Sequence, residues 1–426
     1  MLLTASDRHR PITAQGSKKQ TRCRVCFFSP LRRYLDLGLT PLANGYLKRE
    51  QLTQPEFIDE LALLLCENCG LSQLSRVVNP DRMFRQYLYV SSTPQTFRDH
   101  CVELARSATA RVLKKQRGWV LDIGSNDGCL LKSFKSKGWK VLGVDPAKNL
   151  AAEANKAGIP TLCDYWNERA AQRITRLRGK ASVITSTNVL AHTDDVHSFA
   201  RAVKMTMAPQ GIWVIEVPYL LDFIRHNEFD TAYHEHLSYF AAAPLGHLLT
   251  SYQLQIFDAQ TFPELHGGTL RLWVSHAGAR PISPRIAALL ARENRFGLKT
   301  LSVYRAFAER VLTNKKGLAR LILRLHQQGR TIWAYGASAK GNTLMNFFNL
   351  DRKLIPVVVD DNPKKWGYYT PGSHMRITGI HELKTQNVDY LLLLAWNFAK
   401  EIKERCKKAG YRKSFILPVP KARILR

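Results

Sequence analysis

Short apolar segments alternate with amphipathic stretches through the middle of the chain, and this alternation predicts parallel strands covered by helices. The apolar segments of strand length are residues 119–123, 140–144, 182–185 and 212–217. Two later segments, 254–261 and 269–275, flank a turn-rich stretch that contains two adjacent glycines. We expect these two segments to form an antiparallel pair that closes the same sheet.

The alternation resumes after a long helical stretch over residues 286–328. Further strands are expected at residues 331–335, 355–360, 390–395 and 414–418. The pattern therefore predicts an α/β protein with one α/β domain at residues 81–280 and a second, Rossmann-like α/β domain at 281–426. A turn-rich module is expected before them at residues 21–80, and the polar residues 1–20 are expected to be a mobile tail.

The composition is that of a globular protein with a large surplus of positive charge. The 426 residues include 63 Lys and Arg against 34 Asp and Glu, a formal net charge of +29. This charge favours phosphate-bearing partners, but a proteome-wide basic bias would produce it too, and its spread along the chain disfavours a specific nucleic-acid surface. No apolar run approaches the roughly 18 residues of a membrane span, and the N-terminus does not resemble a secretory signal. We expect a cytoplasmic protein without a membrane partner.

Two CxxC motifs in the N-terminal module indicate a metal site. Cys23 and Cys26 form one motif, and Cys66 and Cys69 form the other. Together they can supply four thiolates to one tetrahedral Zn²⁺, which leaves no open position for catalysis. Disulfides are the alternative, and a cytoplasmic protein disfavours them. The sequence therefore predicts a structural zinc ion.

The first expected strand of the central domain runs into a glycine-containing turn with several polar residues. Within this stretch, Asp122, Gly124, Asn126 and Gly128 are candidate cofactor-binding residues, because glycines let the backbone approach a ligand at a helix start. The spacing does not match the G-x-G-x-x-G dinucleotide motif. Asp145 ends the next strand, where a carboxylate can accept hydrogen bonds from ribose hydroxyls. These features favour S-adenosylmethionine over NAD.

Several polar residues, most of them titratable, follow the later strands at the edge of the sheet where ligands of α/β proteins bind. Asn188 and His192 come after one strand, and the segment 233–240, YHEHLSYF, brings Tyr233, Glu235 and His236 close together in the chain. This spacing differs from the H-E-x-x-H metalloprotease motif, so proton transfer is favoured over a second metal. A surface loop with incidental histidines is the alternative.

The second α/β domain begins with its own glycine-containing turn, YGASAKGNT at residues 335–343. Ser338, Lys340 and Asn342 could bind a diphosphate at the start of the following helix. The order of glycine and lysine differs from a P-loop, so nucleoside triphosphate hydrolysis is not supported. An ordinary helix N-cap is the alternative.

Taken together, these motifs resemble the sugar-nucleotide C-methyltransferases that make branched deoxysugars, and the likeness runs from about Cys23 to the C-terminal strand. The matching stretches are the two CxxC motifs, YLYVSS (87–92), DIGSNDG (122–128), GVDP (143–146), VLAH (189–192), YHEHLSYF, HGGTLRLW (266–273), YGASAKGNT, DNP (361–363), PGSH (371–374) and AWNF (395–398). The resemblance implies a zinc-binding module, a central class I methyltransferase domain that binds S-adenosylmethionine, and a C-terminal Rossmann-like domain. The sugar nucleotide would lie between the last two domains.

The resemblance also implies a substrate and roles for individual residues. The substrate would be a dTDP- or GDP-linked 4-keto-6-deoxy sugar, methylated at C3 through an enolate, and the protein is expected to be a monomer. His236 would be the general base, with its tautomer set by a nearby carboxylate. The residues that would orient the substrate or stabilise the enolate are Glu235, Tyr233, His192 and Tyr89. Tyr87 and Asn188 would join the cofactor site, and His374 and Asn397 would join Ser338, Lys340 and Asn342 in binding the substrate.

Two other functions remain open from the sequence. The charge, the zinc motifs and the cofactor turn are also compatible with a zinc-ribbon RNA methyltransferase. The C-terminal domain argues against it, because clustered arginines interleaved with stacking aromatic residues are absent. A non-catalytic protein that binds a sugar nucleotide or the cofactor is the third hypothesis, and the intact YHEH segment disfavours it.

Overall fold

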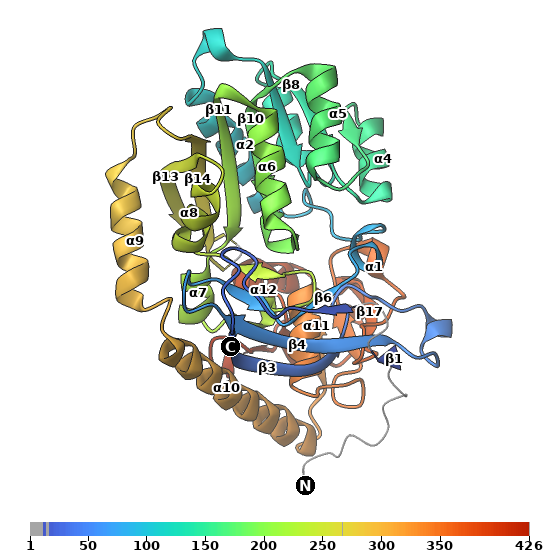
Figure 1. The fold of residues 1–426 in the computed structure, drawn as a ribbon. Coiled ribbons are helices and arrows are strands. Elements are labelled where there is room, and N and C mark those ends of the chain that lie inside the picture. The colour runs from blue at the N-terminus through green and yellow to red at the C-terminus, as the bar shows by residue number, and fades with distance from the viewer. Residues whose placement is uncertain (1–11, 14–16, 266, 426) are drawn as a thin grey trace.

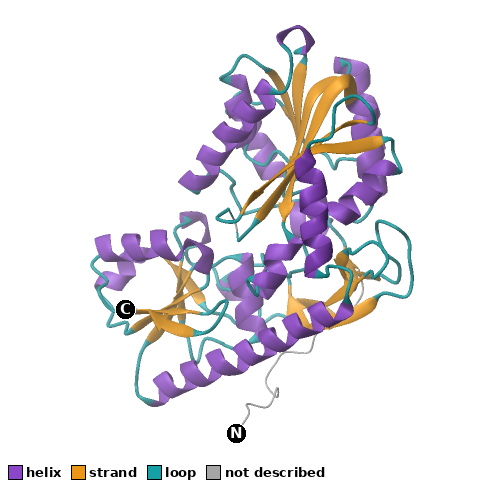
Figure 2. Cartoon of the chain, turned by 90° about the vertical axis from the view of Figure 1, so that its left-hand side faces the viewer, coloured by secondary structure: helices purple, strands orange, loops and turns teal. Residues whose placement is uncertain are grey.

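Three sheet-containing units make up the computed structural model, which describes residues 12–13, 17–265 and 267–425 (Figure 1). Figure 2 shows the large central sheet in the upper part of the molecule, with the N-terminal and C-terminal sheets side by side below it. None of the helices in the described ranges has a stretch that is long and apolar enough to span a bilayer.

The central sheet has seven strands, and all except one run parallel. In spatial order the strands are β13 (Leu254–Phe262), β14 (Thr269–His276), β11 (Met207–Pro218), β10 (Ala181–Thr187), β7 (Trp119–Ile123), β8 (Lys140–Val144) and β9 (Thr161–Leu162). Strand β14 lies antiparallel to both of its neighbours. The four strands and the antiparallel pair expected from the sequence are confirmed, and β9 is a short addition that the apolar pattern did not show.

Helices cover both faces of this sheet, which explains why its strands read as continuous apolar runs. Val120 and Val183 pack toward α2 (Gln95–Ala110) and α3 (Cys129–Lys135). The adjacent residues of the same strands, such as Leu121, point to the opposite face, which is covered by α5 (Glu168–Arg178) and α6 (Val196–Thr206). The remaining helices of this unit are α4 (Lys148–Lys156), α7 (Leu220–Arg225) and α8 (Ala242–Thr250).

The N-terminal unit is built on a five-stranded sheet that takes one strand from the central part of the chain. Its strands are β1 (Ile12–Thr13), β3 (Arg32–Pro41), β4 (Phe57–Leu65), β5 (Ser72–Leu74) and β12 (Ser238–Tyr239), and β2 (Ser17–Lys19) pairs separately with β6 (Arg76–Val78). Strand β12 belongs to the YHEHLSYF segment and pairs with β5. Residues 1–11 and 14–16 of the expected tail lie outside the described residues, whereas 12–13 and 17–19 form β1 and β2.

The C-terminal unit has a six-stranded sheet. Its strands are, in spatial order, β17 (Arg376–Thr378), β16 (Val357–Val359), β15 (Ile332–Tyr335), β18 (Tyr390–Leu393), β19 (Ser414–Leu417) and β20 (Arg423–Leu425), with helices α11 (Ala339–Phe347) and α12 (Ala399–Lys408). Only β20 is antiparallel to its neighbour. The four expected strands are present. The short strands β17 and β20 were not predicted, because their sequences, RIT and RIL, lack the continuous apolar run that the equally short β16 has in VVV.

The long helical stretch between the two α/β units is in fact two helices. Helix α9 (Pro284–Phe296) ends at Gly297, whose φ of 86° is a left-handed conformation that glycine adopts without strain. Helix α10 (Leu301–Gln327) then runs beneath both lower sheets (Figure 2). Tyr304 of α10 packs on Tyr34 of β3, with ring centroids 4.8 Å apart, while Asn314 donates to the carbonyl of Pro418. Helix α10 therefore joins the N-terminal unit to the C-terminal unit.

Short helical turns complete the described structure. They are η1 (Arg49–Gln51), α1 (Asp81–Phe84), η2 (Lys114–Gln116), η3 (Leu190–His192), η4 (Phe229–Thr231), η5 (Pro363–Lys365), η6 (Ile380–Lys384) and η7 (Trp396–Phe398). The turns η3 and η4 lie directly beside the residues that the sequence singled out for chemistry.

Candidate active site

The four cysteines of the CxxC motifs converge in the N-terminal unit. The sulfurs of Cys23 and Cys69 are 3.5 Å apart, as are those of Cys26 and Cys66, and all four lie within 4.8 Å of one another. Zn–S bonds of about 2.3 Å place tetrahedral sulfurs about 3.8 Å apart, so this cluster fits one zinc ion. The backbone N–H of Val25 points at the sulfur of Cys23, at 3.4 Å, and stabilises a thiolate there.

The expected cofactor turn lies at the carboxyl end of β7, next to the end of β8. Gly124 and Gly128 have φ values of 69° and 76°, and Asn126 is also left-handed with φ of 51°. A Cβ on Gly124 would lie 2.2 Å from Cγ2 of Val189, so only glycine fits against the loop that follows β10. The backbone N–H of Asn188, in that loop, donates to the carbonyl of Glu216.

The carboxylate of Asp145 holds this turn in place. Its Oδ2 accepts the backbone N–H of Asn126 at 2.8 Å, and its Oδ1 accepts the backbone N–H of Ala147 at 2.9 Å. Burial raises the pKa of Asp145 above its ordinary value, and the two hydrogen bonds oppose that rise. Asp145 therefore presents an oriented carboxylate beside the turn, and this arrangement fits the ribose of S-adenosylmethionine.

Asp122 lies deeper in the sheet than the other cofactor-site candidates. Its Oδ1 accepts a hydrogen bond from the Thr185 hydroxyl at 2.6 Å, and burial raises its pKa to about 7. The side chain is 2% exposed. Its described partner belongs to the neighbouring strand, so it fixes the ends of β7 and β10 relative to each other.

The segment before α2 crosses the cofactor turn. Asn126 bonds this segment twice, because its Oδ1 accepts the N–H of Ser91 at 3.0 Å and its Nδ2 donates to the carbonyl of Tyr89 at 3.2 Å. The Tyr87 hydroxyl continues toward the histidine segment and donates to Glu235 at 2.7 Å. Tyr89 remains 43% exposed. The segment therefore links the cofactor turn to the YHEH residues.

His236 is buried and its tautomer can be assigned from its partners. Nδ1 lies 2.9 Å from the carbonyl oxygen of Thr231, which can only accept, so Nδ1 carries the proton. Nε2 therefore has the lone pair, and it accepts the hydroxyl of Tyr233 at 2.8 Å. The expected carboxylate does not set this tautomer; the Thr231 carbonyl does. Burial, with the adjacent His192, lowers the pKa of His236 well below its usual value, so the imidazole is neutral.

His192 and Glu235 complete the cluster around His236. The His192 ring lies edge-on to the His236 ring, with centroids 4.8 Å apart, and burial lowers its pKa to about 4. The two carboxylate oxygens of Glu235 accept hydrogen bonds from Tyr87 and from Nδ2 of Asn44, each at 2.7 Å. Burial raises the pKa of Glu235 to about 7. The sequence did not single out Asn44, because it lies in a loop of the N-terminal unit with no motif of its own.

The C-terminal unit contributes Lys340 and its neighbours to the same region. The Lys340 ammonium lies 5.4 Å from the Trp396 ring centroid, and the Trp396 indole donates to Asp230 at 2.6 Å. Burial raises the pKa of Asp230 to about 6, and the charge of Lys340 opposes that rise. The same positive charge disfavours protonation of His236. Lys340 is thus electrostatically coupled to the histidine cluster, and Asp230 is a second residue that the sequence did not reveal.

The other residues expected to bind the substrate are Ser338, Asn342 and Asn397, and the first two make structural hydrogen bonds. The Ser338 hydroxyl accepts the N–H of Gly341 at 3.1 Å and caps α11, so the N-cap interpretation describes its contact. Asn342 donates to the carbonyl of Ala43 at 2.7 Å and so holds the loop that carries Asn44. Asn397 lies in η7, next to Trp396.

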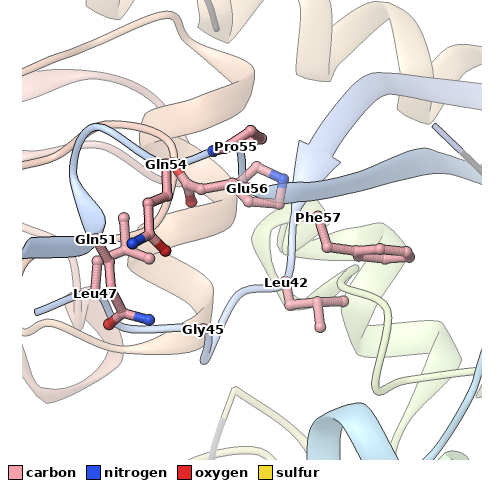
Figure 3. A pocket seen from close by; sticks show the side chains of 9 residues that line it. Leu42, Gly45, Leu47, Gln51, Gln54, Pro55, Glu56 and Phe57 are labelled. Atoms are coloured by element: carbon pink, nitrogen blue, oxygen red, sulfur yellow. The ribbon is translucent and has the colours of Figure 1, made fainter. Parts of the chain in front are cut away.

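His374 lies beside the N-terminal unit rather than in the histidine cluster. Its Nε2 is 2.5 Å from the carboxylate of Glu56, which also accepts the N–H of Gly372. Glu56 belongs to a pocket of about 210 Å³ (Figure 3). The pocket is lined by Pro41, Leu42, Gly45, Leu47, Gln51, Gln54, Pro55, Glu56 and Phe57. The structure therefore groups His374 with a different surface from Lys340.

Comparison with known proteins identifies the family. Family models match three consecutive regions: a zinc binding domain at residues 23–84, a methyltransferase domain at 96–259 and a C-methyltransferase C-terminal domain at 264–420. The C-methyltransferase NovU of Streptomyces niveus is 33% identical over 411 residues, which cover 95% of this chain and 96% of that protein. This chain belongs to the C-methyltransferase family.

Other similar proteins share only part of this C-methyltransferase. The ubiquinone biosynthesis O-methyltransferase of Escherichia coli O127:H6 is 30% identical over 96 residues, which cover 22% of this chain and 39% of that protein. The crystal structure of magnesium protoporphyrin IX methyltransferase from Synechocystis PCC 6803 with bound SAM is 13% identical and covers 43% of this chain and 79% of that chain, with a TM-score of 0.32.

The matched domains and the fold define the cofactors of the C-methyltransferase. Its central domain has the class I methyltransferase fold that binds S-adenosylmethionine, and its four-cysteine cluster is the centre of a zinc-binding module. These two expectations from the sequence are confirmed.

Removing the Asp145 carboxylate is expected to weaken the binding of S-adenosylmethionine. Asp145→Ala leaves the N–H groups of Asn126 and Ala147 without their acceptor, so the turn loosens and the ribose loses its partner. Loss of charge-assisted hydrogen bonds of this kind predicts a dissociation constant about 10- to 100-fold higher by calorimetry. Asp36→Ala, at an exposed aspartate of β3, is the matched control. Unchanged affinity in Asp145→Ala would contradict this assignment.

Proposed function

We propose that the C-methyltransferase transfers a methyl group to C3 of a nucleotide-linked 4-keto-6-deoxy sugar. The observation that carries the proposal is the buried His236, whose neutral imidazole has its lone pair on Nε2, contacts the His192 ring and is influenced by the charge of the C-terminal Lys340. Resemblance to the sugar-nucleotide C-methyltransferases supplies the identity of the substrate. A cytoplasmic monomer that acts on a small molecule is part of the same proposal.

Carbon can act as the nucleophile because of the adjacent ketone. The proton at C3 is acidic, since the electron pair left behind delocalises into the C4 carbonyl and forms an enolate. Nε2 of His236 takes this proton. On substrate binding the Tyr233 hydroxyl turns from Nε2 to the C4 oxygen, where it stabilises the developing negative charge by hydrogen bonding.

The two bound partners would meet at the carboxyl ends of the central strands. Bound S-adenosylmethionine supplies an electrophilic methyl group on a sulfonium sulfur. The turn with Gly124 and the carboxylate of Asp145 would hold the nucleoside end, so that the methyl group could face C3. The enolate carbon would then bond to the methyl carbon, and the carbon–sulfur bond would break with its electron pair staying on sulfur.

The C-terminal unit would hold the nucleotide part of the substrate. Lys340 is a positive charge at the beginning of α11, where backbone N–H groups also favour an anion. A diphosphate bound there would place the attached sugar toward Asp230 and the histidine cluster, because Lys340 and Trp396 already connect these residues. His192 and Tyr89 then border the sugar on the side of the central unit.

Isotope transfer tests the proposed reaction. The protein is incubated with methyl-¹³C S-adenosylmethionine and a panel of dTDP- and GDP-linked 4-keto-6-deoxy sugars, and the products are analysed by NMR. In the expected product the ¹³C-labelled methyl group is bonded to C3. The substrate is also expected to exchange its C3 proton in deuterated water. Label on oxygen, or label only on RNA offered in parallel, would overturn the proposal. Binding of both partners without transfer by the intact protein would support the non-catalytic alternative.

Glu235 is expected to control the acidic side of the pH profile. Burial raises its pKa to about 7, so its carboxyl becomes protonated as the pH falls below about 7 and can no longer accept on both oxygens from Tyr87 and Asn44. We expect kcat/KM to fall below pH 7 in the wild type. In Glu235→Gln, kcat/KM should no longer fall near pH 7. It should fall only at lower pH, where His236 becomes protonated. An unchanged profile in Glu235→Gln would exclude this role.

A further inference from the structure

Arg24 lies between two zinc ligands and reaches out of the zinc-binding module. Its side chain is 1% exposed. Nη1 donates to the backbone carbonyl of Leu237 at 2.9 Å, and Nε is 3.2 Å from the carboxylate of Asp194. Cys23 and Cys26, two of the four clustered cysteines, lie on either side of Arg24 in the chain. The guanidinium is therefore a direct connection between the metal-binding turn and the central unit.

Both partners of Arg24 lie next to the histidines of the active site. Leu237 directly follows His236, and Asp194 comes two residues after His192. The two histidine rings, which belong to separate loops, are in edge-on contact at 4.8 Å. A single buried side chain therefore holds both loops, and its position helps to set the distance between the two rings.

Further contacts hold the same turn against the central unit. The carbonyl of Val25 is 3.0 Å from Nε2 of His197, and Phe27 stacks on the His197 ring with centroids 4.6 Å apart. His197 is in α6, the helix that follows the His192 turn. The backbone N–H of Arg24 donates to the side chain of Gln73, in the strand that pairs with β12. The turn thus touches the elements on either side of the histidine pair.

Packing alone does not explain why a charged residue occupies this buried position. Moving a guanidinium into the interior carries a desolvation penalty, and an apolar side chain of similar volume would fill the same space without that penalty. What an apolar residue could not do is bond the Leu237 carbonyl and the Asp194 carboxylate at the same time. The fork geometry of arginine is suited to joining two loops.

We propose that Arg24 is a positioning residue for methyl transfer, through which the zinc-binding turn sets the placement of His236 and His192. This positioning role rests on the proposed function, which gives His236 and His192 their roles in catalysis. Zinc then has a second effect besides stabilising the N-terminal unit: it orders the turn from which Arg24 bridges the catalytic loops. The described partners of Arg24 are Gln73, Asp194 and the Leu237 carbonyl, none of which is assigned to the sugar or the cofactor, so its loss should slow the chemical step without weakening the binding of either one.

Substitutions at Arg24 test this role in the full-length zinc protein. Arg24→Met keeps an unbranched chain but loses both bonds, and it is expected to lower kcat by about 100-fold, the effect of a misplacement of about 1 Å, with KM and cofactor affinity unchanged. Arg24→Lys can bond one partner and should recover part of the rate. Arg32→Met removes the exposed ion pair to Glu67 from the same module and is the matched control, with wild-type kcat expected.

Imidazole NMR provides a measurement that does not depend on turnover. With ¹⁵N-labelled histidine, the ring resonances of His192 and His236 should shift in Arg24→Met and stay in place in Arg32→Met. Unchanged resonances together with an unchanged kcat in Arg24→Met would overturn the positioning role. So would a loss of rate that is fully explained by lost zinc or by a lower melting temperature. If Arg24→Met does not fold, Asp194→Ala removes the acceptor at the exposed end of the same bridge and is subject to the same criteria.

The two hypotheses can fail separately. If the wild-type protein methylates none of the keto sugar nucleotides, the proposed function fails, and the NMR comparison still shows whether Arg24 orders the histidine pair. If methylation occurs and Arg24→Met retains full rate and resonances, only the positioning role fails.

Discussion

His236→Asn is expected to lower the rate of methyl transfer by about 10²- to 10⁴-fold, the usual contribution of a general base. Asparagine is close to histidine in size and can still donate to the Thr231 carbonyl, but its amide cannot take a proton from carbon at neutral pH. The affinity for S-adenosylmethionine should persist, because the described partners of the cofactor turn do not include His236. Single-turnover kinetics and calorimetry measure the two effects separately.

A second measurement connects this loss to the proton-transfer step. Exchange of the C3 proton of the substrate with deuterated water should stop in His236→Asn, even when S-adenosylhomocysteine replaces the methyl donor. His247→Asn, at an exposed position of α8, is the matched control and should retain exchange and transfer. Full exchange in His236→Asn would assign the base to another residue.

Loss of the zinc ion is expected to have the largest effect on stability. Cys66→Ser removes one of four thiolates that lie within 4.8 Å of one another, and the remaining three bind zinc much less tightly. Structural zinc contributes about 10–16 kcal/mol to folding in isolated zinc-finger peptides. In this chain the metal would connect two turns of the N-terminal unit, at residues 23–26 and 66–69. The sheet of that unit ends in β12, which belongs to the YHEHLSYF segment. We therefore expect a lower melting temperature and loss of methyl transfer together.

Metal analysis and calorimetry test this expectation. The wild-type protein should contain zinc, lose it to a strong chelator and show a lower melting temperature afterwards. Cys163→Ser replaces an exposed cysteine outside the cluster and should keep both the zinc content and the melting temperature. A Cys66→Ser protein with full zinc content and an unchanged melting temperature would show that the cluster is not the metal site.

The sequence alone determined the features that depend on local pattern. The strands of both α/β units, apart from the short β9, β17 and β20, were predicted, because strands buried on two faces are continuous apolar runs, as in β7, where every residue is buried. The zinc site was predicted because two CxxC motifs fix the ligand type and the local spacing. The turn at Gly124 and the YHEH segment were likewise visible as compact motifs, although the roles of their residues remain predictions.

Only the tertiary structure decided how these motifs are combined. Asn44, Arg24 and Asp230 meet partners that are far away in the chain, namely Glu235, Leu237 and Trp396. No periodicity records such contacts, because each depends on how separate units pack. The same holds for the tautomer of His236, which the Thr231 carbonyl sets, and for β12, which joins the N-terminal sheet. Local patterns specify elements and ligand types, whereas long-range packing decides which side chains meet.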